Sequence, residues 1–135
     1  MRIGIMLRCI DEKGGIGIYA RNIVEELLKI DQKNQYVLFY RTQQHLSRFS
    51  GFHNVTKRVV KCRNKALWDQ VLIPLMVLKE KVDVLFNPKF TLPLFVKAKA
   101  VMVVHGADWF LPEYRHLYNP IDVLYIRMTM PLYFR

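Results

Sequence analysis

Apolar and polar positions along the chain alternate between short continuous apolar runs and longer stretches with helical spacing. The short runs are almost wholly apolar, as in strands buried on both faces of a parallel sheet. They predict strands at residues 2–7, 36–40, 54–61, 82–86 and 98–104. The helical spacing predicts helices at 18–30, 43–49, 66–81 and 121–135. Pro74 should kink or interrupt the third helix, and loops are predicted at 87–96 and 105–120.

The regular alternation of strands and helices predicts an open α/β fold, with a parallel sheet that has helices on both faces. The 135 residues correspond to one domain. The predicted helix at 121–135 is strongly apolar and has no capping signal after it. We therefore expect residues 1–135 to form a single, incomplete Rossmann-like domain.

Composition excludes several classes of protein. Hydrophobic residues make up 52% of the chain and charged residues 24%, which excludes a disordered protein. Charged residues or prolines interrupt every apolar run, so we expect no ordinary transmembrane helix, and the N-terminus lacks the apolar core of a signal peptide. Cys9 and Cys62 have neither metal-ligand spacing nor the number needed for a disulfide framework. We expect a cytoplasmic protein with two reduced thiols and no metal site.

The formal net charge of +10 predicts that the surface attracts a polyanion. The basic residues of one segment are Lys57, Arg58, Lys61, Arg63 and Lys65, and the apolar residues nearby are Trp68, Leu72 and Leu75. Basic and exposed apolar residues together suit an anionic membrane surface, so peripheral binding at the inner face of a membrane is one hypothesis. A solvated strand end is the plainer interpretation of each basic residue. The chain has no aromatic-basic RNA signature and no helix-turn-helix pattern, so we expect no nucleic-acid partner.

Three glycines, Gly14, Gly15 and Gly17, stand between the first predicted strand and the first predicted helix. Glycines let the backbone approach a ligand, and the start of the helix offers free N–H groups and a positive dipole end to a phosphate. The spacing is neither that of dinucleotide-binding loops nor that of a P-loop. A glycine-rich turn without a ligand explains the same residues.

His105 directly follows the last predicted strand, which places it at the carboxyl edge of the sheet, with Asp108 nearby. Ligands of open α/β sheets bind at this edge. A histidine there can bind a sugar hydroxyl or a phosphate, although many single histidines are structural.

The segment Asn87–Pro93 follows the fourth predicted strand and should lie on the same edge. Lys89 could reach a phosphate, and Asn87 or Thr91 could bind hydroxyl groups. For Asn87 and Thr91 a rigid turn shaped by two prolines is the competing interpretation. These groups together suit the binding of a phosphorylated ligand.

Several segments resemble the amino-terminal domain of the family 4 retaining glycosyltransferases, which have the two-domain GT-B architecture. The most specific are GGIGIYARN and VVHGADWFLPEY, and the resemblance extends from residue 1 to residue 135. It implies that Gly14, Gly15 and Gly17 lie against the diphosphate of a nucleotide-sugar donor. It also implies that His105 is catalytic and faces the transferred sugar and the acceptor. Many members have His-Asp at this point, whereas Asp108 stands three residues after His105.

The resemblance further implies that this domain binds mainly the acceptor, a glycan or a lipid-linked sugar of cell envelope polysaccharide biosynthesis. Most of the donor would be held by a carboxy-terminal domain, and no segment here matches its E-x7-E motif. We therefore expect the chain alone not to transfer sugar and to need no cofactor or metal. The alternative is a stand-alone phosphate- or nucleotide-binding module of flavodoxin-like shape, without catalysis.

Overall fold

The computed structural model describes residues 1–106, 111–117 and 119–133. The strands are β1 (Arg2–Met6), β2 (Gln35–Tyr40), β3 (Val55–Val59), β4 (Val84–Asn87) and β5 (Lys99–Met102). The α-helices are α1 (Gly15–Ile30), α2 (Lys65–Leu67), α3 (Ile73–Lys79) and α4 (Pro120–Tyr133). Short 3-10 helices lie at Arg8–Asp11 and Pro112–Leu117, and a π-helical turn lies at Trp68–Leu72.

The strands form one parallel sheet in the order β3-β2-β1-β4-β5. The chain leaves β1 towards β2 and β3 on one side and then crosses back to β4 and β5 on the other. The predicted fold class is therefore confirmed. The order of the strands reverses between β1 and β4, and loops that leave neighbouring strands in opposite directions create a crevice at the carboxyl edge.

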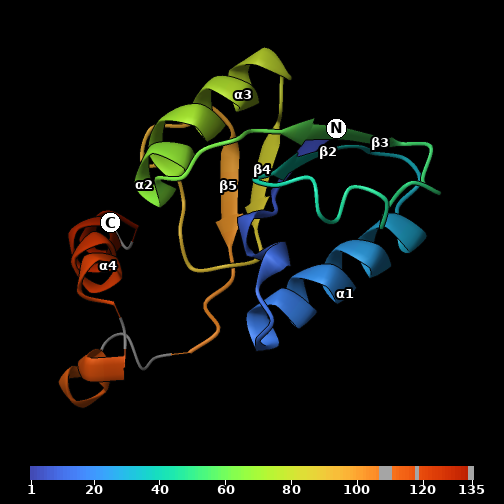
Figure 1. The fold of residues 1–135 in the computed structure, drawn as a ribbon. Coiled ribbons are helices and arrows are strands. Elements are labelled where there is room, and N and C mark those ends of the chain that lie inside the picture. The colour runs from blue at the N-terminus through green and yellow to red at the C-terminus, as the bar shows by residue number, and fades with distance from the viewer. Residues whose placement is uncertain (107–110, 118, 134–135) are drawn as a thin grey trace.

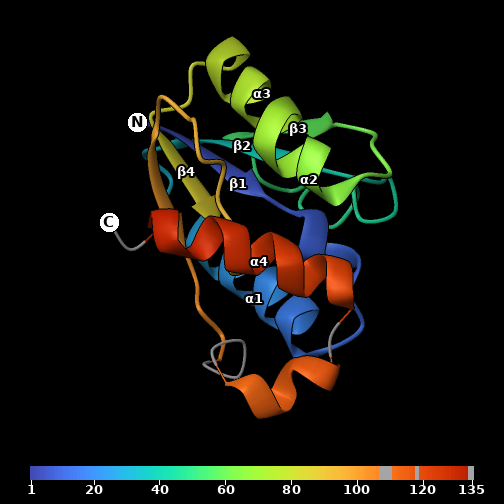
Figure 2. The same cartoon turned by 90° about the vertical axis from the view of Figure 1, so that its left-hand side faces the viewer.

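Helices cover both faces of the sheet (Figures 1 and 2). On one face, Val24 and Leu28 of α1 pack with residues of β1 and β2, such as Ile5 and Leu38. On the other face, α3 packs against Val37, Phe39 and Leu85 through its own Ile73 and Val77. Strand residues alternate between these two clusters, because successive side chains of a strand point to opposite faces.

The helix predicted at 66–81 is interrupted, as Pro74 led us to expect. α2 ends at Leu67, the backbone widens into the π-helical turn, and α3 begins one residue before Pro74. The N–H of Ile73 donates to the carbonyl of Trp68, five residues back, in place of an α-helical bond. Because proline has no N–H and its ring crowds the preceding turn, a wider turn directly before it relieves the clash.

Two predictions about the elements are wrong. Residues 43–49 form turns and not a helix, because the segment folds irregularly over the core with Leu46 and Phe49 packed against the α1 side. The strand before His105 is not buried, since Lys99, Ala100 and Val101 are exposed in β5 at the edge of the sheet.

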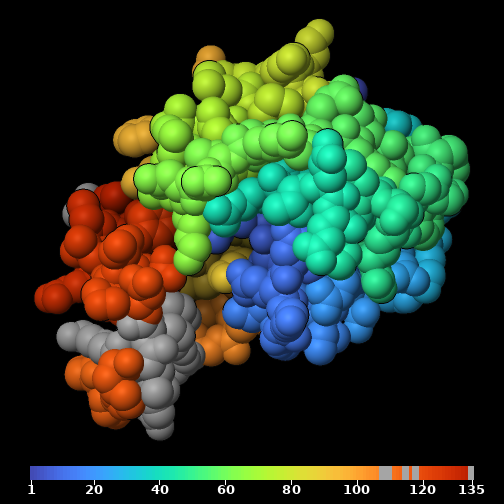
Figure 3. Space-filling model, in the orientation of Figure 1, coloured from blue at the N-terminus to red at the C-terminus, as the bar shows by residue number. Residues whose placement is uncertain are grey.

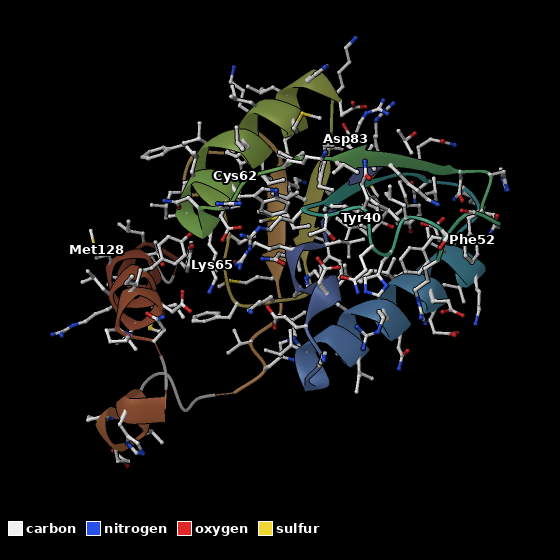
Figure 4. The ribbon with its side chains drawn as sticks, in the orientation of Figure 1. Tyr40, Phe52, Cys62, Lys65, Asp83 and Met128 are labelled. Atoms are coloured by element: carbon white, nitrogen blue, oxygen red, sulfur yellow. The ribbon has the colours of Figure 1, made fainter. Side chains whose placement is uncertain are left out.

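α4 lies beside the sheet and not on either of its covered faces (Figures 1 and 2). The hydroxyl of Tyr133 donates to the carbonyl of Leu92, and Gln70 of the π-helical turn donates to the hydroxyl of Tyr125. The apolar side chain of Met128 is 67% exposed and points away from the domain (Figure 4). Among the residues described, no helix is both long enough and apolar enough to cross a bilayer.

Candidate functional site

The glycine loop reaches the carboxyl edge of the sheet at the crevice between β1 and β4. A Cβ on Gly17 would lie 1.8 Å from the carbonyl oxygen of Glu12, so this position requires glycine. A Cβ on Gly14 or on Gly15 would meet no atom within 4 Å. The backbone is thus tightly packed at Gly17, whereas the space beside Gly14 and Gly15 is open.

The first turn of α1 is open to a ligand on this side. Gly14 is the N-cap residue and supplies no capping side chain, and the first turn contains no acidic residue. The first N–H groups of a helix have no intrahelical partner, and they lie at the positive end of its dipole. The arrangement suits an anion held by the backbone.

His105 lies against the start of α1. Its ring meets the ring of Tyr19 edge to face, with 4.7 Å between the centroids, and its Nε2 lies 2.8 Å from the carbonyl oxygen of Pro88. Because a carbonyl can only accept, Nε2 must carry the proton of this hydrogen bond. In the neutral imidazole, Nδ1 is then an acceptor for a ligand hydroxyl. The structure therefore places the predicted His105 against α1, the helix that begins at the glycine loop.

Asn87 and Thr91 are hydrogen-bonded to each other. Both are buried, and the amide of Asn87 donates to the carbonyl and to the hydroxyl of Thr91. Thr91 also borders the cavity described below, whereas Asn87 is occupied in shaping its loop. These contacts favour the rigid-turn interpretation for Asn87. Asp108, the third residue predicted near the acceptor, lies outside the described residues.

Lys89 crosses the crevice. Its Nζ lies 2.5 Å from Oε1 of Glu12, so the loop after β4 is tied to the loop after β1. The prediction that Lys89 stands at the carboxyl edge is confirmed, but its charge is shared with a carboxylate. A phosphate bound here would compete with Glu12 for the ammonium group.

A buried ion pair below the crevice was missed by the sequence analysis. The guanidinium of Arg8 donates from Nε and Nη2 to the two carboxylate oxygens of Asp69, each over 3.1 Å. Asp69 is fully buried, and this burial raises the pKa of its carboxyl, while Arg8 opposes the shift. The available signal was an aspartate on the buried side of an otherwise apolar helical pattern, LWDQVLIP.

A cavity of about 740 Å³, the main cavity, opens between these loops and α4. Its wall on the sheet side includes Ile16, Lys89, Thr91 and His105. α4 and the residue before it contribute the opposite wall, with Asn119, Ile121, Asp122, Tyr125 and Ile126. Figure 3 shows the recess between α4 and the body of the domain. The contribution of α4 to this cavity was not predicted.

The predicted basic segment does not form one patch. Lys57 donates to the carbonyl of Leu46, and Arg58 is paired with Glu80 over 2.6 Å. Trp68, expected beside these residues as an exposed apolar group, is instead fully buried in the core. Its burial follows from its position on the side of the helix that faces the sheet, where its indole N–H donates to the carbonyl of Val60.

Both cysteines are free thiols. Burial, helped by the negative charge of Glu12, raises the pKa of Cys9 to about 11, so its thiol stays protonated and unreactive at neutral pH. Within the described ranges, no group of three or more potential metal ligands comes together.

Comparison of the chain with models of known protein families, with curated proteins and with solved structures gives no significant match.

Proposed function

We propose that this chain is the acceptor-side domain of a retaining glycosyltransferase that uses a nucleotide-sugar donor. One observation carries the proposal: the start of α1, through Ile16, and His105 line the same side of the main cavity at the carboxyl edge of the sheet, and the His105 ring packs on Tyr19 of α1. A phosphate-binding element and a hydroxyl-binding side chain are what a donor diphosphate and its sugar require.

In this proposal the diphosphate lies against Gly14 and Gly15, where no side chain hinders its approach. The sugar is directed into the main cavity towards His105. In this proposal Nδ1 of His105 accepts a hydrogen bond from a sugar hydroxyl, and the bond from Nε2 to Pro88 fixes the ring. The bond from the anomeric carbon to the diphosphate breaks as the acceptor oxygen attacks from the same side. The hydroxyl proton of the acceptor passes to the departing diphosphate oxygen.

The contribution of the protein to such a reaction is positioning and charge stabilisation. No side chain is required as a nucleophile. The groups at this edge are backbone amides, a histidine and a lysine, which can position the substrates and stabilise charge without a nucleophile.

The alternative function is a phosphate- or nucleotide-binding module without catalysis. It uses the same open helix start but gives no role to His105. The two functions differ in one measurement, because only the transferase requires that loss of the imidazole abolish a chemical step while the diphosphate still binds.

The test has two stages. Titration of the chain with pyrophosphate and with nucleoside diphosphate sugars, followed by backbone NMR, should move the amide signals of Gly14 to Gly17 first. Gly15→Val should weaken this binding without unfolding the domain, because its side chain would enter open space on the ligand side. The natural gene product that carries this chain should then transfer labelled sugar with retention. Diphosphate binding elsewhere on the chain would contradict the proposal.

We also propose that the chain contacts an anionic membrane surface through the outer side of α2 and α3. Leu67, Val71, Leu75 and Leu78 are each about half exposed and follow one another at helical spacing on this side. Lys65 precedes this stripe, and Lys79 and Lys81 follow it, all of them exposed. An apolar stripe bordered by lysines on a strongly basic protein is typical of a surface that lies against anionic lipids.

A further inference from the structure

A second concave surface, the basic cleft, lies beside the main cavity and has a volume of about 740 Å³. Its basic residues come from the segments that follow three strands and from the start of α2, and they are Arg8, Arg41, Lys61, Arg63 and Lys65. Arg8 and Lys65 border both the cleft and the main cavity, so the two are contiguous. Figure 4 shows Lys65 between α2, α4 and the loop after β1.

Three of the cations near the cleft already have carboxylate partners. Arg8 is paired with Asp69, Lys89 with Glu12, and Lys65 with Asp122. Within each pair the positive and negative charges cancel. The remaining charged groups therefore determine the charge of the cleft.

The remaining cations are Arg41, Lys61 and Arg63, and the remaining carboxylate is Asp11. Asp11 accepts a hydrogen bond from the hydroxyl of Thr42. Lys61 and Arg63 are exposed, and the charged end of neither side chain has a hydrogen bond or an ion pair with any residue that the structure describes. The cleft therefore carries an excess of two positive charges, which is the charge that one phosphate monoester would neutralise.

Arg41 is held in place for such a ligand. Its Nε donates to the carbonyl of Cys62 and its Nη2 to the carbonyl of Arg63, both over 2.7 Å. Both acceptors are neutral, so the positive charge of the guanidinium is not cancelled. Two fixed bonds leave further N–H groups of the same fork available, and a guanidinium that is already positioned loses little entropy when it binds an anion.

We propose that the basic cleft binds a phosphoryl group carried by the acceptor, whose sugar portion extends into the main cavity. The assignment to an acceptor rests on the proposed transferase function, whereas the phosphate site rests on the charges and contacts of the cleft alone. Such an acceptor is a phosphosugar or a sugar joined to a lipid through phosphate. A nucleic acid would instead require a basic stripe that follows a long backbone.

The probe for the site is glycerol 3-phosphate, a phosphate monoester, with glycerol as the uncharged control. Calorimetric titration of the full chain should show saturable binding of glycerol 3-phosphate that weakens with added salt, and no binding of glycerol. In the Lys61→Gln/Arg63→Gln double variant the affinity should fall at least ~10-fold, because both charge-assisted contacts are lost.

The matched control is Lys33→Gln/Lys97→Gln, which removes the same net charge from two exposed lysines that border neither cavity. It should bind within about twofold of the wild-type chain, since only long-range attraction is lost. All four side chains are exposed, so the variants should fold, and circular dichroism checks this. Equal weakening in both double variants, or unchanged affinity in Lys61→Gln/Arg63→Gln, would overturn the site.

The source of the phosphate is distinguished with vesicles of phosphatidylcholine containing phosphatidic acid. Binding that glycerol 3-phosphate displaces and that the Lys61→Gln/Arg63→Gln variant loses supports the site with a lipid-linked acceptor. Saturable binding of glycerol 3-phosphate without such vesicle binding supports it with a soluble acceptor. Because no donor is present, phosphate binding can succeed or fail independently of sugar transfer, which keeps the two proposals separable.

Discussion

The ion pair between Nζ of Lys89 and Oε1 of Glu12, 2.5 Å apart, spans the point where the order of the sheet reverses. One partner follows β4 and the other follows β1, so the pair lies across the crevice in which we place the donor diphosphate. Glu12 thus ties Lys89 across the crevice and opposes an anion at this position.

Glu12→Gln should therefore tighten pyrophosphate binding roughly fivefold, because Lys89 becomes available to the anion at a gain of about 1 kcal/mol. The free energy of unfolding should change by less than about 1 kcal/mol, since both partners are partly exposed. Calorimetric titration and urea unfolding measure the two quantities. Glu26→Gln removes the same charge from an exposed pair on α1, and equal tightening there would show that net charge alone is responsible.

The glycines of the loop should differ sharply in their tolerance of a methyl group. Gly17→Ala should lower the free energy of unfolding by about 1–3 kcal/mol or more, because its Cβ would collide with the backbone oxygen of Glu12. Gly15→Ala should leave it unchanged or raise it by up to about 1 kcal/mol, as for a Gly→Ala change in a compatible helical position. Urea unfolding of both variants tests this, and similar losses would contradict the geometry of the loop.

The parts of the fold that could be predicted from sequence are those with local causes. Periodicity identified the five strands of the sheet that the structure describes, and Pro74 marked the interruption between α2 and α3. The prediction at 43–49 failed because Leu46 and Phe49, three residues apart, fit one helical face and an irregular segment equally well. The exposure of β5 could not be predicted, since an apolar run does not reveal which strand lies at the edge of the sheet.

The residues of the candidate site also divide into those with a local signal in the sequence and those without one. The glycines, Lys89 and His105 could be placed at the carboxyl edge because each lies in the connection that follows a predicted strand. Their partners could not be predicted: Glu12 meets Lys89 across 77 positions of the chain, and Arg8 meets Asp69 across 61. Such pairs depend on the order of the strands, which local patterns do not determine.

His105→Ala should lower sugar transfer by the natural gene product at least ~100-fold, the scale of one lost positioned contact. Because His105 is exposed, the domain should stay folded, and pyrophosphate binding should change less than twofold. His45→Ala is the matched control, since His45 borders neither cavity and should leave transfer unchanged. Near-normal transfer in His105→Ala would reduce His105 to a structural role.

The proposed membrane surface predicts that Leu75→Asp/Leu78→Asp loses binding to phosphatidylglycerol-containing vesicles at least ~10-fold, because two apolar side chains no longer enter the interface. Co-sedimentation with vesicles measures this. Ile30→Asp is the control, because it places an aspartate at an exposed apolar position at the end of α1, away from this surface. Its binding to the vesicles should fall only by the small amount that one added negative charge causes. Equal binding by Leu75→Asp/Leu78→Asp and the wild-type chain would exclude this surface.

The pair of Arg8 and Asp69 predicts a pH-dependent loss of stability in Arg8→Met. Asp69 is fully buried, so removing its partner leaves an uncompensated charge that should cost about 3–5 kcal/mol at pH 7. Burial already raises the pKa of Asp69, and losing Arg8, which opposes that shift, should raise it further. A carboxyl whose pKa is higher in the folded than in the unfolded state stabilises the fold below its unfolded pKa of about 3.9, and this stabilisation is lost as the pH rises through the folded pKa. The loss in free energy of unfolding of Arg8→Met relative to wild type should therefore be smallest near pH 4 and grow towards pH 7.

Urea unfolding between pH 4 and pH 8 can measure this deficit, with the buried Trp68 beside Asp69 as a fluorescent reporter. Arg8→Met/Asp69→Asn is the control, because without a carboxyl at position 69 the growth of the deficit with pH should disappear. A deficit in Arg8→Met that is the same at pH 4.5 and pH 7.5 would mean that lost packing of the Arg8 stem, and not the stranded charge of Asp69, destabilises the variant.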